Sequence, residues 1–452
     1  MATTIDAAGR AEGAQEVLRR IDDENVEFVR FWFTDILGQI KSFAVGREEM
    51  EDAFEGGMGF DGSSIVGFNA IEESDMIAMP DPSTFKLLPW RSSGEHKVGR
   101  MFCDILTPDG EPYAGDPRHV MRRAIERARS MGFDEYYLGP ELEFFLFKDD
   151  KSTEVLDKGG YFDLTTLDVA SDFRRDVVFT LRELGIPVEY THHEVGPSQH
   201  EIDMRFTDGL TMADNTMTYR IAVKEVAMAH GCYATFMPKP LFGENGSGMH
   251  THQSLFTDGR NAFFDADDEY YLSSAAKSFI AGQLRHAREL SALFAPLVNS
   301  YKRLVLGYEA PVYLAWSRRN RSALVRVPLY HPGKEKATRA ELRCPDPSCN
   351  PYLTFAAMLH AGLDGIEKGY ELPPPIERNL YDLSPEERHE MGVEQLPETL
   401  GEAIEELCRS EVVEKALGEH VFSRYVDIKR EEWEEYRVQV TPWELDRYLA
   451  VT

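Results

Sequence analysis

The run YYLGPELEFFLF, residues 136–147, constrains the fold more than any other stretch of the chain. Its aromatic and aliphatic residues predict a buried strand. Glu141 and Glu143 stand two positions apart, so both carboxylates project from one face of that strand. Among Phe and Leu the two groups would desolvate and repel each other unless a cation lay between them. A solvated charged face on an edge strand is the alternative interpretation.

Composition excludes several functional classes. The 452 residues carry a formal net charge of −29, which disfavours general binding to nucleic acid or to anionic membranes. The five cysteines form no CxxC pair, so we expect neither a disulfide framework nor a zinc site, and a cytoplasmic location fits. We also expect no signal peptide and no membrane span.

Pattern along the chain predicts an α+β protein. Residues 25–45 predict a β-hairpin, and residues up to about 105 a small, mostly β unit, followed by a Pro- and Gly-rich linker. Asp116, Pro117 and Gly132 then bracket a helix as N-cap, first turn and stop. Strands near 136–147 and 186–195 alternate with helices near 172–184 and 213–230, and the last third is mainly helical.

Three further pairs of residues extend the acidic face. Glu194 and Glu201 flank a Gly-Pro turn, so a hairpin would bring them together. Glu341 and Arg343 share a strand face. In NGSGMHTHQS, residues 245–254, His250 and His252 also share one. Five carboxylates with one histidine favour Mg²⁺ or Mn²⁺ over zinc, and more than one ion would be needed for neutrality.

A cationic group lies within residues 299–328. The arginines there suit carboxylate or phosphate recognition, although a surface ion-pair network is the plainer alternative. They are Arg303, Arg318, Arg319, Arg321 and Arg326. Divalent metals together with arginines indicate phosphoryl transfer. The GxGxxG match at 57–62 is discounted because no helix is predicted after it. Asp61, taken alone, is typical of a turn.

Taken in order, these segments resemble type I glutamine synthetases of bacteria and archaea over nearly the whole chain. The matching stretches are FDGSSIVGF, ESDMIAMPDPSTF, GPELEFFLF, HHEVGPSQHEID, MPKPLFGENGSGMHTH, NSYKRLVLGYEAP, NRSALVRVP, RAELRCPDPSCNPYL and NLYDLSPEE. The resemblance implies an N-terminal helical segment (1–20), a β-grasp domain (21–107) and a catalytic domain (114–452) with a curved antiparallel sheet and helices. It also implies a dodecamer of two hexameric rings with active sites between subunits.

The same resemblance implies a role for each matching residue. One metal would be held by Glu143, Glu194 and Glu201, and the other by Glu141, His250 and Glu341. Glutamate and the transferring phosphoryl group would meet Asn245, Gly246, Arg303, Glu309, Arg321 and Arg343. ATP would meet Glu189, His252, Ser254, Arg321, Arg326 and Arg339. Asp61 of the adjacent subunit would bind and deprotonate ammonium, and Glu309 would sit on a flap that excludes water.

The resemblance also raises questions of regulation. The spacing of Glu194 and Glu201 and the short chain look like the alpha subclass, which lacks an insertion linked with adenylylation control. Yet NLYDLSPEE resembles the loop that is adenylylated in the beta subclass, which makes Tyr381 a candidate for modification. Ala70 stands where feedback-inhibited alpha enzymes have an arginine, so that form of inhibition is in doubt.

Three rival functions remain open at this point. A paralogue could ligate glutamate to another amine, such as a polyamine or ethanolamine, with the same metal and ATP residues. A catalytically silent relative should have lost a ligand or an arginine, and none is missing. A nitrogen-sensing role through a transcription factor leaves no trace in the sequence.

Overall fold

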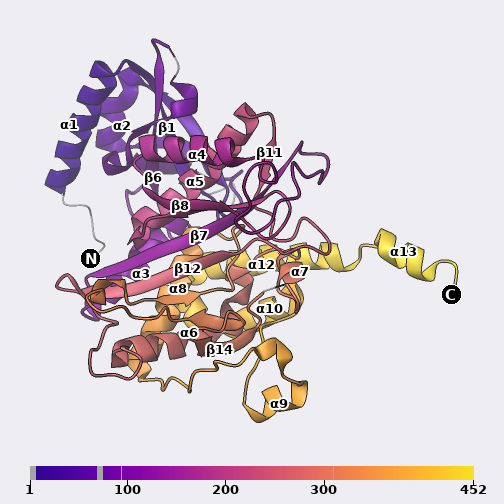
Figure 1. Cartoon of the computed structure of the whole chain (residues 1–452). Helices are drawn as coiled ribbons and strands as arrows, with labels where there is room; N and C mark the ends of the chain where they lie inside the picture. The colour runs from indigo at the N-terminus through magenta and orange to yellow at the C-terminus, as the bar shows by residue number, and fades with distance from the viewer. Residues whose placement is uncertain (1–6, 69–74, 93, 309) are drawn as a thin grey trace.

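The computed structural model describes residues 7–68, 75–92, 94–308 and 310–452. Its N-terminal part is a six-stranded sheet, ordered β2-β1-β6-β4-β3 with β5 on β6, flanked by two helices (Figure 1). The bounds are α1 Ala7–Asp23, β1 Val26–Thr34, β2 Ile40–Gly46, α2 Met50–Gly56, β3 Met58–Asp61, β4 Asp75–Pro80, β5 Lys86–Leu87 and β6 Lys97–Leu106. The antiparallel β1–β2 pair confirms the predicted hairpin.

The larger part is a ten-stranded sheet ordered β14-β15-β16-β12-β7-β9-β8. It is antiparallel along this path except that β14 and β15 run parallel. The bounds are β7 Glu135–Phe147, β8 Val188–His193, β9 Gln199–Met204, β10 Thr207–Asp208, β11 Tyr233–Thr235, β12 Met249–Thr257, β13 Arg260–Asn261, β14 Tyr313–Ser317, β15 Ala323–Arg326 and β16 Ala340–Leu342.

Helices pack against this sheet and against one another, and α13 extends away from the body of the molecule (Figure 1). The bounds are α3 Pro117–Ser130, α4 Ser171–Glu183, α5 Gly209–Ala229, α6 Ser274–Phe294, α7 Ser300–Arg303, α8 Pro351–Lys368, α9 Pro385–Glu390, α10 Leu400–Leu407, α11 Glu411–Leu417, α12 Glu419–Arg437 and α13 Pro442–Tyr448. No helix within the described residues is long and apolar enough to cross a membrane.

The predicted start and stop of α3 are confirmed. The Asp116 side chain accepts a hydrogen bond from the Arg118 backbone N–H, and Gly132 beyond the helix has φ +91°. The segment expected to be a linker instead folds back on β6, where Tyr113 N–H donates to Ile105 O at 2.9 Å and the Tyr113 ring is buried. Pro and Gly marked a turn here rather than a loose connection.

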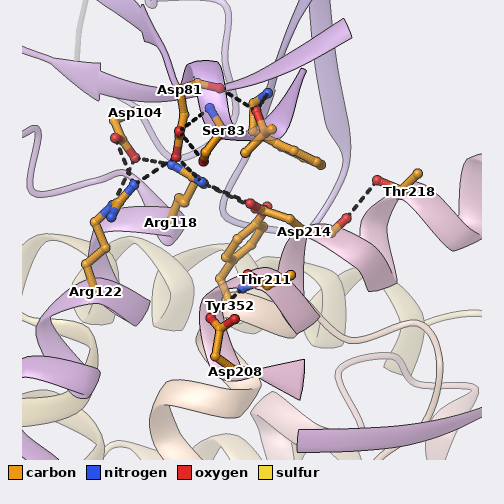
Figure 2. Close-up of polar contacts among 12 residues, drawn as sticks. Asp81, Ser83, Asp104, Arg118, Arg122, Asp208, Thr211, Asp214, Thr218 and Tyr352 are labelled. Atoms are coloured by element: carbon orange, nitrogen blue, oxygen red, sulfur yellow. Dashed lines mark hydrogen bonds and ion pairs between the residues drawn. The ribbon is translucent and has the colours of Figure 1, made fainter. Parts of the chain in front are cut away.

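A buried ionic network joins the two parts of the chain (Figure 2). Arg118 of α3 contacts Asp81, which follows β4, at 2.8 Å, Asp104 of β6 at 2.6 Å and Asp214 of α5 at 2.9 Å. The Tyr352 hydroxyl of α8 also donates to Asp214 at 2.5 Å. The Arg118 guanidinium therefore connects the N-terminal sheet to helices α3 and α5. Each of its hydrogen bonds to an aspartate is charge-assisted.

Candidate active site

Strand order brings the predicted ligands onto neighbouring strands. In the pairing of β7 with β12, Glu141 lies opposite His250, and in the pairing of β7 with β9, Glu143 lies opposite Glu201. Glu341 of β16 lies opposite His252 of β12. Side chains directly opposite each other share a face, so these strands form one acidic wall.

The first cluster within this wall contains Glu141, His250 and Glu341, whose ligand atoms lie within 4.8 Å of one another. His250 Nδ1 is 3.5 Å from Glu141 Oε2 and 3.9 Å from Glu341 Oε1. The structure thus brings together all three residues expected for one metal, although His252 Nε2 also lies 2.8 Å from Glu141 Oε1.

The second cluster differs in one member from the expected set. Glu194 and Glu201 come together as the hairpin predicts, but the third ligand-type side chain beside them is His192, 3.5 Å from Glu194 and 3.9 Å from Glu201. Glu143 lines the same cavity and accepts hydrogen bonds from Gln199 Nε2 at 3.0 Å and Gly248 N–H at 3.1 Å.

Sequence reasoning missed His192 and Asp203. Asp203 forms a third group with Glu141 and Glu201 within 4.8 Å. The two-residue repeat of a β-strand could have identified them from the sequence. His192 stands two positions before Glu194, and Asp203 stands two positions after Glu201.

The electrostatics of the wall fit a cation. Burial, followed by the charge of Glu194, raises the pKa of Glu143, and burial, followed by the charges of Asp203 and Glu143, raises the pKa of Glu201. Burial acts in the same direction on Glu141, but hydrogen bonds from His250 and His252 hold its pKa well below the usual range. Carboxylate oxygens that repel one another in a buried cavity, with imidazole beside them, are a donor set for Mg²⁺ or Mn²⁺.

The loop before β12 depends on two glycines. A Cβ at Gly246 would lie 2.5 Å from Pro238 O and 2.9 Å from Arg303 Cγ. A Cβ at Gly248 would lie 2.6 Å from Arg303 Nη2. The absence of side chains lets this backbone pass against the buried Arg303, which donates to Cys344 O at 2.7 Å.

Four arginines line the same cavity as the carboxylates. Arg303, Arg321, Arg326 and Arg343 line a cavity of about 490 Å³ together with the acidic clusters, Asn245 and Gly246. Arg326 Nε is 2.6 Å and Arg343 Nε 3.3 Å from Glu341. Burial opposes ionisation of Glu341, but the charges of His252 and Arg343 lower its pKa overall. Arg318 and Arg319 do not line this cavity, so the predicted arginine cluster divides.

A second cavity of about 280 Å³ adjoins the first, and Glu141 and Tyr190 line both. Four residues expected on the nucleotide side line it, namely Glu189, His252, Ser254 and Arg339. Arg339 Nε donates to His252 Nδ1 at 3.1 Å. A chain of contacts therefore runs from Arg339 through His252 to Glu141, from one cavity to the other.

Asp61 and Tyr381 line neither cavity. Asp61, at the end of β3, is exposed and accepts a hydrogen bond from Ser63 N–H at 2.8 Å, outside both cavities of this chain. The half-buried Tyr381 donates its hydroxyl to Ala310 O, and Ala310 lines the larger cavity. Glu309 and Ala70 lie outside the described residues.

Fold and site together define a class of α+β protein with a small β unit and a large sheet that carries an acidic, arginine-lined cavity. Residues 25–108 match the family described as "Glutamine synthetase, beta-Grasp domain", and residues 114–448 match "Glutamine synthetase, catalytic domain". The chain belongs to the glutamine synthetase family, as the sequence predicts.

Similar proteins support this assignment. A glutamine synthetase of Mycolicibacterium smegmatis is 54% identical over 96% of this chain and 98% of its own, and one of Methanosarcina mazei is 53% identical over 97% and 98%. The solved structure named "GmaS/ADP complex-Conformation 1" has a TM-score of 0.88 at 33% identity, covering 96% of this chain and 99% of its own. A Plasmodium falciparum glutamine synthetase has a TM-score of 0.86 at 26% identity, covering 96% and 98%.

Proposed function

We propose that this chain joins ammonia to the γ-carboxylate of L-glutamate at the expense of ATP. The γ-phosphoryl group of ATP passes to the carboxylate, giving γ-glutamyl phosphate and ADP. Ammonia then attacks the acyl carbon and expels phosphate, giving L-glutamine. The observation that carries the proposal is the pair of adjoining cavities that meet at Glu141, one lined by carboxylates and arginines and the other by Glu189, His252, Ser254 and Arg339.

Six side chains would hold two or more Mg²⁺ or Mn²⁺ ions. Glu143, Glu194 and Glu201 would take one ion, and Glu141, His250 and Glu341 the other. A cation there offsets negative charge on the transferring phosphoryl group. The raised pKa of Glu143 and of Glu201, caused first by burial, supports this assignment, because an added positive charge would relieve both carboxylates.

Glutamate and the phosphoryl group would occupy the larger cavity. Asn245, Gly246 and Arg303 would bind glutamate. Arg321 and Arg343 would face the phosphoryl group, because a guanidinium pairs two oxygens of one anion. Glu309 would exclude water that otherwise hydrolyses the acyl phosphate.

ATP would occupy the smaller cavity, where Glu189, His252, Ser254 and Arg339 contact the nucleotide. Arg321 and Arg326, at the larger cavity, would reach its phosphates. The contact of His252 with both Arg339 and Glu141 supports a role at the junction of nucleotide and metal.

The active form would be a dodecamer of two hexameric rings in the cytoplasm. Asp61 would act in the neighbouring subunit's cavity, where it binds and deprotonates ammonium. Its exposed position at the end of β3, away from both cavities of its own chain, supports this arrangement. Use of another amine is not favoured, because the relatives above half identity carry the name glutamine synthetase.

ATP-dependent phosphate release tests the proposal directly. The assay contains glutamate, Mg²⁺ or Mn²⁺, and ammonium, ethanolamine or a polyamine. We expect release with ammonium and glutamine as the product. Release only with another amine would overturn the ammonia assignment while keeping acyl-phosphate chemistry, and no release with any amine would overturn the ligase function.

A further inference from the structure

A buried polar cluster lies behind the hairpin that carries Glu194 and Glu201. His193 and His200 pair across β8 and β9 and stand next in sequence to Glu194 and Glu201, so they project from the opposite face. Their ring centroids are 4.9 Å apart, and Asp157 joins them. All three are buried and none lines either cavity.

Asp157 receives hydrogen bonds from its own segment and from the hairpin. Its Oδ1 lies 3.0 Å from His193 Nε2 and accepts from Ser198 N–H at 3.0 Å and from Gly159 N–H at 3.3 Å. Its Oδ2 accepts from Val169 N–H at 3.1 Å. One carboxylate thus connects the segment 157–169 to the hairpin.

The hairpin turn needs such support. Ser198 is fully buried with φ +55°, a left-handed conformation that is uncommon for a residue other than glycine. Its Oγ accepts from Leu156 N–H at 2.7 Å and from Asp157 N–H at 3.0 Å. These bonds hold the turn that spaces Glu194 from Glu201.

His193 carries the connection on to Glu194 itself. While Nε2 faces Asp157, Nδ1 lies 2.7 Å from the backbone oxygen of Glu194. Each ring nitrogen therefore faces an oxygen, and the imidazole bridges Asp157 to the backbone of a proposed ligand.

The cluster is better explained as a scaffold than as a metal centre. Arg174 Nη1 donates to His200 Nδ1 at 2.9 Å and to Asp168 Oδ1 at 3.1 Å. A guanidinium already supplies the positive charge beside His200. Because Nδ1 of His200 accepts this hydrogen bond, Nε2 of the neutral ring carries the proton and offers a metal no lone pair.

The segment that Asp157 anchors also reaches the larger cavity. The rings of Tyr161 and Phe162 lie 5.3 Å and 4.8 Å from the ring of His192, and Tyr161 lines the cavity. We infer that Asp157 is a positioning residue, which fixes the Glu194–Glu201 turn against this aromatic segment and so sets the affinity of the cavity for a divalent cation. This inference rests on the proposed function for its metal, but not for its structural part.

Hydrogen exchange of the full-length, metal-free protein tests the structural part. Asp157→Ala removes the acceptor for Ser198 N–H, so we expect the backbone amides of the 194–199 turn to exchange at least about 10-fold faster than in the wild type. The matched control is Asp149→Ala, because Asp149 is an exposed aspartate that accepts only from the local turn at Lys151 and Ser152. Unchanged exchange in Asp157→Ala would overturn the inference.

Mn²⁺ titration followed by electron paramagnetic resonance tests the link to the metal. We expect Asp157→Ala to raise the Kd for Mn²⁺ by about 10–100-fold, the effect usual for residues that orient metal ligands, and Asp149→Ala to leave it unchanged. The KM for ATP should stay within about twofold, since Asp157 does not line the second cavity. Equal Kd values in wild type and Asp157→Ala would overturn the inference.

A second pair of variants guards against misfolding. His193→Gln keeps an N–H for Asp157 whereas His193→Leu does not, so we expect the Kd for Mn²⁺ to rise less in the Gln variant. Equal weakening of Mn²⁺ binding in both variants, when both unfold thermally like the wild type, would overturn the inference. Absence of Mn²⁺ binding in the wild type would instead refute the proposed metal site, and hydrogen exchange would still decide the role of Asp157.

Discussion

At the scale of single residues, the cavity is shaped as much by missing side chains as by charged ones. Gly246 and Gly248 allow the backbone before β12 to pass against Arg303, and a methyl group at either position would meet an atom closer than 3.0 Å. The arginine is in turn held by backbone carbonyl oxygens of Cys344 and Arg343, at 2.7 Å and 3.2 Å. A small displacement of this loop would therefore move the Arg303 guanidinium together with His250, a proposed metal ligand.

Gly248→Ala should reduce kcat/KM for glutamate by about 100-fold, because a displacement of about 1 Å near a reacting group has costs of that order. The new Cβ would lie 2.6 Å from Arg303 Nη2 and 3.2 Å from His250 Nε2. Gly56→Ala is the control, since nothing lies within 4 Å of its Cβ. Steady-state kinetics of both variants check this, and wild-type kinetics in Gly248→Ala would contradict it.

His250→Ala should raise the Mn²⁺ concentration that gives half-maximal activity by more than about 100-fold, since it deletes a proposed ligand rather than a residue that orients one. His331→Ala, an exposed histidine outside the cavity, should behave as the wild type. Activity measured over a range of Mn²⁺ concentrations makes the comparison. Full activity of His250→Ala at low Mn²⁺ would remove His250 from the metal site.

At the scale of elements, the network around Arg118 decides how the N-terminal sheet sits on the helices. Asp81, Asp104 and Asp214 belong to three different parts of the fold, and Arg118 is 3% exposed among them (Figure 2). A buried charge of this kind is costly alone, so each partner depends on the others. The ion network therefore specifies the docking of β4 and β6 on α3 and α5.

Arg118→Met should lower the free energy of unfolding by about 3–5 kcal/mol, because it leaves buried carboxylates without their counter-charge. Arg19→Ala, an exposed arginine paired only with Glu16, should change it by less than about 0.5 kcal/mol. Urea denaturation followed by circular dichroism measures both. Equal stability of the two variants would mean that the network contributes no net stability.

The same network should give a defined pH dependence. Burial opposes ionisation of Asp104, but the charges of Arg118 and Arg122 lower its pKa to about 2. A folded pKa below the unfolded value of about 3.9 means that this stabilisation is complete above pH 4 and is lost as pH falls toward 2. The stability difference between wild type and Arg118→Met should therefore narrow from pH 5 to pH 2.5. Urea denaturation at each pH measures it, and a constant difference would contradict the assignment.

At the scale of the whole molecule, two hydrophobic cores meet. One lies within the N-terminal part, and the other contains Trp32, Ile36, Leu88 and Phe102 from that part together with the helices of the larger part. The N-terminal sheet is thus packed firmly on its own chain while Asp61 lies outside both cavities. An ammonium site that contains Asp61 then requires a second subunit, so the proposed dodecamer is part of the proposed catalysis.

Mixing two inactive variants tests this sharing of sites. Asp61→Ala and Arg343→Ala should each be inactive alone, because each breaks every site of its own oligomer. Co-expressed in equal amounts with different tags, they should recover about a quarter of wild-type activity, since a site between unlike subunits can draw both intact residues. Purified mixed oligomers with no recovered activity would place Asp61 and Arg343 in one subunit's site.

Much of this protein follows from its sequence. Period and capping predicted the β1–β2 hairpin, α3 and β7, because those signals act over a few residues and tertiary packing reinforces them. The glutamine synthetase family and most of the residues that line the larger cavity were also predicted, since motifs record which side chains the chemistry needs. Domain boundaries and the roles of individual residues remain predictions.

Only the tertiary structure determined which side chains come into contact when they are far apart in the sequence. His192 and Asp203 lie in the acidic wall, whereas Arg318 and Arg319 do not line the cavity. Strand order and the course of a loop determine which side chains share a cavity. The linkage of Asp157 to the Glu194–Glu201 turn and of Arg118 to three distant aspartates is likewise invisible to local pattern. Hydrogen bonds act only over contact distance, and folding alone brings such partners within it.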